Sequence, residues 1–168
     1  MSAPDGPLVV EGSCVEIGDD VDTDRMYPGR YLGLTDWSEQ ARHVLEGLGP
    51  EWPARVARAT VLVAGRNLGH GSNREAAATG LRGAGIRLVI AQSCSRAFFR
   101  NCVNNGLPVI QDAKLAQAIS DGETIRADLS VGRLEVSGRP YEFAPLPPML
   151  HAIVSAGGLL NTLSAGQQ

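Results

Sequence analysis

A serine and an arginine stand two residues apart in a glycine-rich turn near the middle of the chain. The stretch 65–75 reads G-R-N-L-G-H-G-S-N-R-E and directly follows the apolar run 61–64. Ser72 and Glu75 have the S-x-x-E spacing of a capping box, which predicts that Ser72 is the N-cap of a helix. The free N–H groups of such a helix start and the Arg74 guanidinium would both favour a bound anion. The pattern fits an anion site with a hydroxyl at its centre, and it also fits an ordinary strand-to-helix turn.

The length and composition are those of a globular protein. The chain has 168 residues, of which 43% are hydrophobic and 20% charged, so we expect one domain over residues 1–168 with its motif-bearing core at about 8–160. A net charge of −3 gives no electrostatic footprint for nucleic acid. No apolar run approaches the roughly 20 residues that cross a bilayer, which excludes a membrane span. The first residues lack the features of a signal peptide, so we expect a cytoplasmic protein.

The residues that commonly bind metals are scattered. Cys14, Cys94 and Cys102 are odd in number and form no C-x-x-C pair, and the three histidines form no H-x-x-x-H pattern. The acidic stretch 19–24 does not match the D-x-D-x-D-G calcium loop. The glycine-rich turn also fails both nucleotide-binding fingerprints, because it lacks the third glycine of G-x-G-x-x-G and the G-K-[ST] of a P-loop. We therefore expect no metal held by this chain alone.

Apolar runs and helical periods alternate along the chain and predict an α/β fold. The expected strands lie at 8–17 (with a bulge or bend at Gly12), 61–64, 86–91, 107–110, 124–129, 132–136 and 140–143. The expected helices are 36–48 after the cap Asp36, 72–84, one capped by Ser95, one capped by Asp112, and a last one near 149–154. The strand–helix–strand centre implies right-handed crossovers and a parallel core sheet flanked by helices, with additional β structure from both ends of the chain.

Four segments resemble the signatures of one known family. Residues 22–32, D-T-D-R-M-Y-P-G-R-Y-L, are similar to its D-T-D-x-I-x-P-x-x-Y-L opening, and residues 65–75 are similar to its G-x-N-F-G-C-G-S-S-R-E motif. Residues 93–101 resemble S-F-A-R-I-F-Y-R-N, and residues 104–109 resemble N-x-G-L-P-V. The family is the aconitase-superfamily swivelling domain, in the order and spacing of the small subunits of isopropylmalate and homoaconitate isomerases. The resemblance covers residues 8–160 and implies the compact swivelling β/β/α fold.

The resemblance implies a hydro-lyase subunit of the 3-isopropylmalate dehydratase type, which dehydrates and rehydrates a 2-hydroxy polycarboxylic acid. It implies a heterodimer or heterotetramer with a large subunit that carries a [4Fe–4S] cluster, in agreement with the lack of a cluster-ligand pattern here. By position Ser72 matches the catalytic serine, Arg74 matches the arginine that holds a substrate carboxylate, and Asp24 and Thr23 match cleft residues of the first motif. The N–H groups of Ser72 and Asn73 would stabilise the anionic oxygen that a seryl base requires.

The position after Tyr-Leu in the first motif carries substrate information. Homoaconitate-type members of the family have an arginine there, which pairs with a distal carboxylate, whereas isopropylmalate-type members tend to have an apolar residue. Here Gly33 and Leu34 follow, so we expect these two residues to meet a branched, uncharged group, because a desolvated carboxylate would lack its partner. In the alternative, Gly33 is a turn glycine, Arg30 or Arg25 supplies the charge, and the protein is of the homoaconitase type.

Several family positions are changed in the active loop. His70 replaces the usual Cys, Asn73 replaces the second Ser and Ala76 replaces a His. We expect His70, Gly71 and Asn73 to line the substrate site, with His70 either a proton relay beside Ser72 or a loop residue bonded to the backbone. The changes leave two further alternatives open: a small subunit for another alkylmalate of specialised metabolism, and a non-catalytic anion-binding domain that kept the fold.

Overall fold

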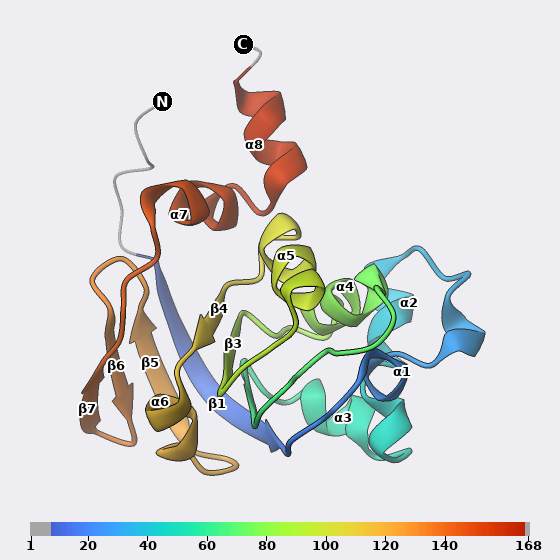
Figure 1. The fold of residues 1–168 in the computed structure, drawn as a ribbon, viewed down its shortest axis with the longest axis horizontal. Helices are drawn as coiled ribbons and strands as arrows, with labels where there is room; N and C mark the ends of the chain where they lie inside the picture. Colours follow the sequence, from blue (N-terminus) through green and yellow to red (C-terminus); the bar gives the residue numbers. More distant parts are fainter. Residues whose placement is uncertain (1–7, 167–168) are drawn as a thin grey trace.

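The computed structural model describes residues 8–166, which are built around a seven-stranded sheet (Figure 1). The strand order is β4-β3-β2-β1-β5-β6-β7, in which β1 to β4 run parallel and β5 to β7 continue the sheet antiparallel. The strands are β1 (Val9–Ile17), β2 (Val61–Ala64), β3 (Leu88–Ala91), β4 (Val109–Gln111), β5 (Thr124–Asp128), β6 (Arg133–Val136) and β7 (Arg139–Glu142). The predicted α/β class, with a parallel core sheet and additional β structure, is confirmed.

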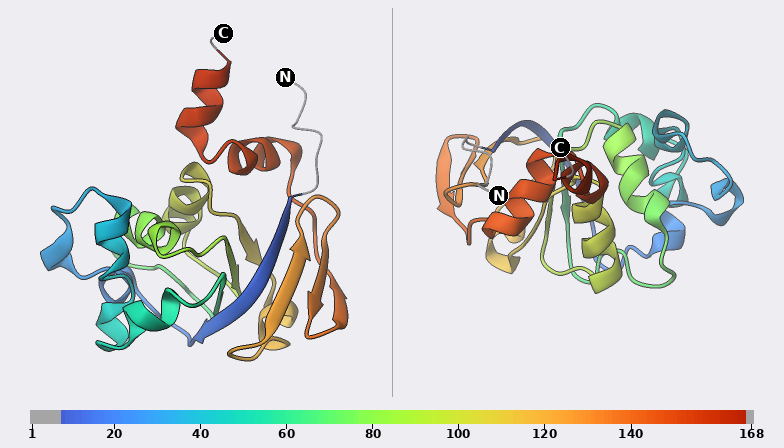
Figure 2. Two further views of the ribbon diagram at one scale, coloured as in Figure 1. Left: turned by 180° about the vertical axis from the view of Figure 1, so that it is seen from behind. Right: turned by 90° about the horizontal axis from the view of Figure 1, so that it is seen from above.

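The helices are short, and most of them lie on one face of the parallel strands (Figures 1 and 2). They are α1 (Thr23–Met26), α2 (Trp37–Ala41), α3 (Trp52–Val56), α4 (Glu75–Gly83), α5 (Arg96–Asn104), α6 (Ala113–Gln117), α7 (Pro148–Ser155) and α8 (Leu159–Ala165), with 3-10 turns η1 (Gly29–Tyr31) and η2 (Glu46–Leu48). Within residues 8–166, none of them has the length and apolar character that crossing a membrane requires.

Strand β1 belongs to both halves of the sheet. Its residues 9–13 pair with β5 and its residues 14–17 pair with β2. The pairing with β5 runs through Gly12 without an inserted residue, so β1 has no bulge there and curves as one long strand (Figure 1). This curvature brings the antiparallel half around one face of the parallel half, where the inner side chains of β5 and β6 join the same buried cluster as those of β2 and β3.

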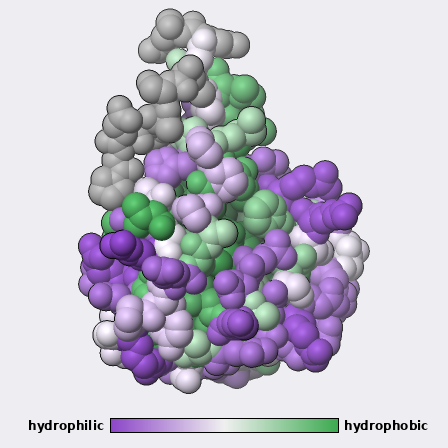
Figure 3. Space-filling view, turned by 60° about the vertical axis from the view of Figure 1, so that its left-hand side comes forward, coloured by the Kyte–Doolittle hydropathy of each residue, from purple (hydrophilic) through white to green (hydrophobic). Residues whose placement is uncertain are grey.

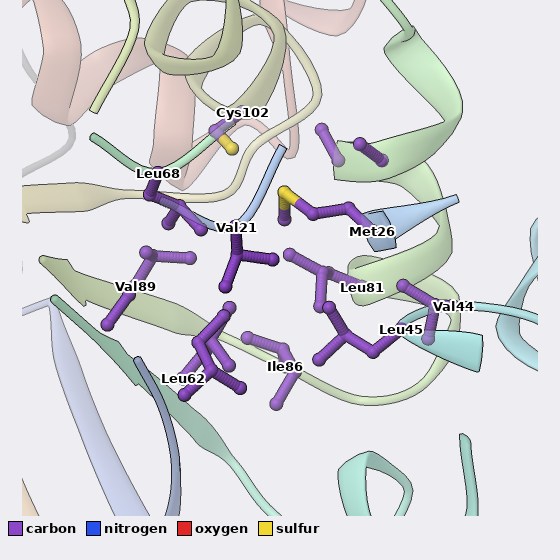
Figure 4. Close-up of a cluster of buried hydrophobic side chains, with 14 of the residues drawn as sticks. Val21, Met26, Val44, Leu45, Leu62, Leu68, Leu81, Ile86, Val89 and Cys102 are labelled. Atoms are coloured by element: carbon purple, nitrogen blue, oxygen red, sulfur yellow. The ribbon is translucent and has the colours of Figure 1, made fainter. Parts of the chain in front are cut away.

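Side chains of the parallel strands alternate between two buried clusters. Leu62 and Val89 face α1, α3, α4 and α5, and Figure 4 shows them packed with Leu81 and other apolar side chains of this layer. Val63 and Ile90 point the other way, toward α6, β5 and β6. Every residue of β2 and β3 is buried, which explains why these strands are continuous apolar runs in the sequence.

Three predicted helix starts are confirmed by their capping bonds. In each case the side chain at the N-cap accepts a hydrogen bond from a backbone N–H in the first turn of its helix. The capping residues are Asp36, Ser95 and Asp112.

The prediction of one helix over residues 36–48 is right for the first turn and wrong beyond it. Helix α2 ends at Ala41, Leu45 adopts φ +60°, and η2 follows. The N–H of Leu45 donates to the carbonyl oxygen of Met26 at 2.6 Å instead of continuing the helix. This long-range bond holds Leu45 beside α1, where its side chain is buried. The sequence patterns also did not predict the short helices α1, α3 and α8.

The small residues of α4 allow close contact with α2 as well as with the sheet. A Cβ atom on Gly83 would lie 2.0 Å from the carbonyl oxygen of Trp37, so a side chain at this position would push the two helices apart. Ala77 and Ala78 are fully buried on the opposite side, against the strands. Helix α4 therefore packs between α2 and the sheet. This packing fixes the position at which the preceding loop, residues 65–74, must enter the helix.

Helices α7 and α8 lie at the amino ends of the parallel strands (Figure 2). Gly157, just after α7, packs against the backbone of Gly106, which stands just before β4. Figure 3 shows hydrophobic side chains on the surface over these helices, where Met149, Leu160 and Leu163 are largely exposed. The opposite edge of the sheet, where the parallel strands end, carries the predicted site residues.

Candidate active site

Two loops meet at the carboxyl edge of the parallel sheet. One follows β1 and the other follows β2, and these neighbouring strands end side by side because Ile17 pairs with Ala64. Four backbone hydrogen bonds join the loops. Two of them lie beside the predicted site: the N–H of Gly69 donates to the carbonyl oxygen of Val21 at 2.8 Å, and the N–H of Thr23 donates to that of His70 at 3.0 Å. The two long sequence motifs are thus brought into contact, at the edge where open α/β sheets bind ligands.

The helix after the second loop begins later than the capping-box pattern predicts. Arg74 occupies the N-cap position of α4 with extended backbone angles, and no side chain caps the helix. The prediction that Ser72 is the N-cap is therefore wrong. The reason is Gly71, whose φ of +94° turns the chain so that residues 72–74 cross the edge of the sheet before the helix can start.

The late helix start leaves Ser72 and its neighbours open. Ser72 is exposed, and its hydroxyl makes no capping bond to α4. Among residues 8–166, the backbone N–H groups of Ser72 and Asn73 have no hydrogen-bond acceptor. Unpaired N–H donors can attract an anion, and here the two donors belong to Ser72 itself and to the residue after it.

Arg74 joins the two loops through its side chain. Its Nη1 donates to the carbonyl oxygen of the buried Tyr27 at 2.8 Å, and its Nη2 lies 2.6 Å from Oδ1 of Asp24. The Arg74 side chain is 16% exposed, whereas that of Asp24 is 68% exposed. The carbonyl of Tyr27 therefore fixes the guanidinium, while the solvated Asp24 is a weak counterion that an incoming carboxylate could replace.

Thr23 lies beneath the turn at Gly71. The residue is 3% exposed, and its hydroxyl oxygen is buried without a hydrogen-bond partner among the described residues. A Cβ atom on Gly71 would lie 3.5 Å from this oxygen. Thr23 therefore supports the loop from inside and does not stand on its open surface, and a buried hydroxyl without a partner carries a free-energy cost.

The side chains of His70 and Asn73 are held by other parts of the protein. The Nε2 atom of His70 lies 3.3 Å from the carbonyl oxygen of Asp20, which is the arrangement of a loop histidine bonded to the backbone. The amide of Asn101 in α5 donates to Oδ1 of Asn73 at 2.7 Å. The carboxamide of Asn73 thus ties the loop to α5, and the backbone N–H of Asn73 stays open.

A pocket of about 380 Å³ lies beside Arg74. It is lined on one side by Asn73, Arg74 and residues of α4, and on the other by the segment between η1 and α2, including Leu32, Leu34 and the ring of Trp37. Gly33 belongs to the same segment, and a Cβ atom added to it would meet nothing within 4 Å. The pocket therefore combines the Arg74 cation with apolar side chains, among polar residues that include Glu75. A carboxylate with an alkyl substituent could use the cation and the apolar side chains.

The cysteines do not form a ligand set. Cys14 and Cys102 are buried and Cys94 is half-buried, and all three are free thiols. Residues 8–166 contain no group of three or more His, Cys, Asp and Glu side chains that could hold a metal ion. Burial raises the pKa of Cys94 to about 11 and also raises the pKa of Cys14 and Cys102, which disfavours the thiolate that an iron–sulfur cluster needs. The side chains of the described residues therefore do not fit an iron–sulfur cluster.

The structure thus gathers most of the predicted site residues, and it adds one that the sequence patterns did not identify. Ser72, Arg74, Asp24 and the N–H of Asn73 lie at one edge of the sheet, while Gly33 and Leu34 flank the pocket beside them. The added residue is Tyr27, whose buried carbonyl orients Arg74. Tyr27 stands three residues after the D-T-D motif and one residue before a proline, and neither feature predicts a bond across 47 positions.

The sequence matches the aconitase C-terminal domain over residues 23–114, more than half of the chain. The chain therefore belongs to the aconitase C-terminal domain family, as its motifs predicted.

Named relatives within this family are similar over nearly their whole length. A 3-isopropylmalate dehydratase small subunit from Moorella thermoacetica is 38% identical over 155 residues, which are 91% of this chain and 93% of the relative. A 3-isopropylmalate dehydratase small subunit 1 from Methanopyrus kandleri is 41% identical over 157 residues, 92% of each chain. The crystal structure of 3-isopropylmalate dehydratase (LeuD) from Methanocaldococcus jannaschii has a TM-score of 0.86 at 36% identity and covers 95% of this chain and 96% of that one.

The raised pKa of Cys94 predicts slow alkylation of this thiol. With a pKa of about 11 instead of 9.0, a smaller fraction of Cys94 is thiolate at pH 8. Iodoacetamide should therefore modify Cys94 about 10-fold more slowly in the folded protein than in the urea-unfolded chain, because the higher nucleophilicity of a high-pKa thiolate offsets part of this loss. Mass spectrometry of timed samples measures both rates on the same residue. Equal rates in the folded and unfolded chains would contradict the burial of this thiol.

Proposed function

We propose that this chain is the small subunit of a 3-isopropylmalate dehydratase, a hydro-lyase that isomerises 2- and 3-alkylmalates by dehydration and rehydration. The observation that carries the proposal is the exposed Ser72 two residues before the anchored Arg74, which lines a pocket together with Leu32, Leu34 and Trp37. The names of the similar small subunits support the same activity. The non-catalytic alternative would leave this combination of open hydroxyl, cation and pocket without a use.

The substrate class follows from the two ends of the pocket. Arg74 offers a guanidinium fork for one carboxylate of a malate, and the neighbouring N–H groups offer donors for an anionic oxygen. Leu32, Leu34 and Trp37 suit a branched alkyl group, and Gly33 leaves room without adding a charge. A homoaconitate-type substrate would bring a further carboxylate to the wall formed by Leu32, Leu34 and Trp37, and none of these three side chains is cationic.

Ser72 is the proposed base. Its alkoxide takes the proton from the carbon next to the hydroxyl-bearing carbon and so becomes the hydroxyl, which gives this proton back to the alkene carbon during rehydration. A free serine is a poor base at neutral pH, so its anion must be stabilised by the positive potential of Arg74 and of the open N–H groups of Ser72 and Asn73. Asp24 shares the guanidinium until the substrate carboxylate arrives.

The departing hydroxyl also needs a Lewis acid, which the ligand set of this chain does not provide. We assign that role to a [4Fe–4S] cluster on a separate large subunit, in a heterodimer or heterotetramer that works in the cytoplasm. The large subunit would close over the carboxyl edge of the sheet, because the open residues Ser72 and Asp24 face outward there. The isolated small subunit should therefore be inactive.

The replacement Ser72→Ala tests the proposed function. In a complex with the large subunit and an intact cluster, alkene formation from 3-isopropylmalate, followed by absorbance, should fall by about 10²- to 10⁴-fold, because general-base catalysis contributes an effect of this size. Ser164→Ala, at an exposed serine of α8, is the matched control and should leave turnover unchanged. Normal turnover in Ser72→Ala would reject Ser72 as the base, and an inactive wild-type complex with an intact cluster would reject the enzyme.

The replacement Gly33→Arg tests the substrate class. An arginine would fit in the open space at this position and would supply the missing partner for a distal carboxylate. The ratio of kcat/KM for homoaconitate to that for 3-isopropylmalate should rise by about 10- to 100-fold, the effect of one charge-assisted hydrogen bond. Gly18→Arg is the control, because Gly18 also has open space around its Cβ position and lies outside the pocket. An unchanged ratio in Gly33→Arg would remove Gly33 from the specificity argument.

A further inference from the structure

The segment between η1 and α2 forms one wall of the pocket, and it is anchored at two points. At one end Tyr31 is fixed by side chains around η2. At the other end the amide of Gln40 donates to the carbonyl oxygen of Leu34 at 2.9 Å, and Gln40 itself accepts a hydrogen bond from Thr79 in α4. Gly33 lies between these anchors, and a Cβ atom added to it would meet no atom within 4 Å. The width of the pocket therefore depends on how firmly both ends are held.

Glu46 is the centre of the anchor at Tyr31. Its carboxylate accepts a hydrogen bond from the Tyr31 hydroxyl at 3.0 Å, contacts Nδ1 of His43 at 2.8 Å and forms an ion pair with Arg30. The hydrogen bonds from His43 and Tyr31 and the pairing with Arg30 lower the pKa of Glu46, so the group is a carboxylate at neutral pH. One carboxylate thus binds three side chains, two of which belong to η1.

The aromatic rings complete the anchor. The Tyr31 ring stacks on the His43 ring with centroids 3.6 Å apart and planes 14° apart. The Arg30 guanidinium lies 4.7 Å from the centroid of the same ring, where the π-system attracts a cation. The Tyr31 ring is therefore held on its faces by His43 and Arg30 and at its hydroxyl by Glu46.

The anchor is connected to the proposed carboxylate-binding arginine. The hydroxyl of Tyr27 donates to the carbonyl oxygen of Tyr31 at 2.9 Å, and the carbonyl oxygen of Tyr27 accepts from Arg74 at 2.8 Å. Tyr27 is fully buried, so a shift of Tyr27 toward Tyr31 would also displace its bond to Arg74. A change at Glu46 is thus transmitted to the pocket wall through Tyr31, without Glu46 lining the pocket.

We propose that Glu46 is a positioning residue that sets the width of the alkyl pocket by clamping Tyr31 and so holding the wall at residues 32–34. This inference takes the alkylmalate substrate from the proposed function. It adds that Glu46, which lies outside the pocket, helps to select the alkyl group. Loss of the clamp would let the wall move away from Arg74. Substrates would then bind less tightly and bulkier alkyl groups would be accepted.

The replacement Glu46→Gln in the complex with the large subunit tests the proposal. The amide keeps one acceptor oxygen but loses the charge that pairs with Arg30, and its NH₂ group cannot accept from His43 or Tyr31. We expect KM for 3-isopropylmalate to rise about 10-fold while kcat changes less than about 2-fold, and the preference for isopropyl over longer alkyl groups to weaken. A fall in kcat with unchanged KM and unchanged alkyl preference is the signature of lost folded protein and would overturn the proposal.

Glu123 provides a matched control. Its side chain is 19% exposed against 21% for Glu46, it also pairs with an arginine, Arg139 at 2.9 Å, and hydrogen bonds also lower its pKa. It lies between α6 and β5 and does not contact the pocket wall. Glu123→Gln should leave KM, kcat and alkyl preference unchanged. An equal rise in KM in both variants would show a general effect of removing a surface charge and would overturn the proposal.

Amide hydrogen exchange of the isolated chain separates this inference from the proposed function. The N–H of Leu34 donates to Tyr31 at 3.0 Å and the N–H of Leu32 donates to Gly29 at 3.2 Å. Both amides should exchange at least 10-fold faster in Glu46→Gln than in the wild type or Glu123→Gln, while amides of α4 stay unchanged. Unchanged exchange at Leu32 and Leu34 would overturn the clamp. If the wild-type complex were inactive on every alkylmalate, the proposed function would fail and the exchange rates would still decide the clamp.

Discussion

The contact between the loops that follow β1 and β2 is the constraint on which the site depends. These strands are parallel neighbours, so their loops leave the same edge of the sheet, and four backbone hydrogen bonds fix one loop on the other. Arg74 adds a side-chain link because its guanidinium is held by the carbonyl of Tyr27. Without this contact Ser72 would be an exposed serine in a glycine-rich turn. With it, the serine stands beside an oriented cation and unpaired N–H donors.

The same contact joins the chemistry to substrate selection. Tyr27 binds Arg74 through its carbonyl and Tyr31 through its hydroxyl, so the carboxylate-binding group and the pocket wall share one buried residue. Under the proposed function, a malate would be bound by its carboxylate at Arg74 and selected by its alkyl group at the pocket wall. This small chain would then form half of an active site, and the proposed large subunit would add the other half.

The sequence patterns predicted the features of the fold that depend on neighbouring residues, such as buried strands and helix caps. The buried runs of β2 and β3 and the caps Asp36, Ser95 and Asp112 were found because burial on two faces and capping leave signals within a few residues. The capping box at Ser72 failed because Gly71 turns the chain before the helix can start. The break at Leu45 depends on Met26, and the clamp at Glu46 depends on Arg30 and Tyr31. These partners are 15 or more positions away, and no periodic pattern records such contacts. The family motifs located the site residues, but the roles of those residues stay proposals.

A crystal structure of the complex with the large subunit and an unreactive alkylmalate analogue would test the central claim most directly. We predict that one carboxylate of the analogue binds both guanidinium nitrogens of Arg74 at about 3 Å in place of Asp24, with the Ser72 hydroxyl facing the carbon next to the hydroxyl-bearing one. A carboxylate bound elsewhere, with Arg74 still paired to Asp24 and Ser72 turned away from the analogue, would contradict the account.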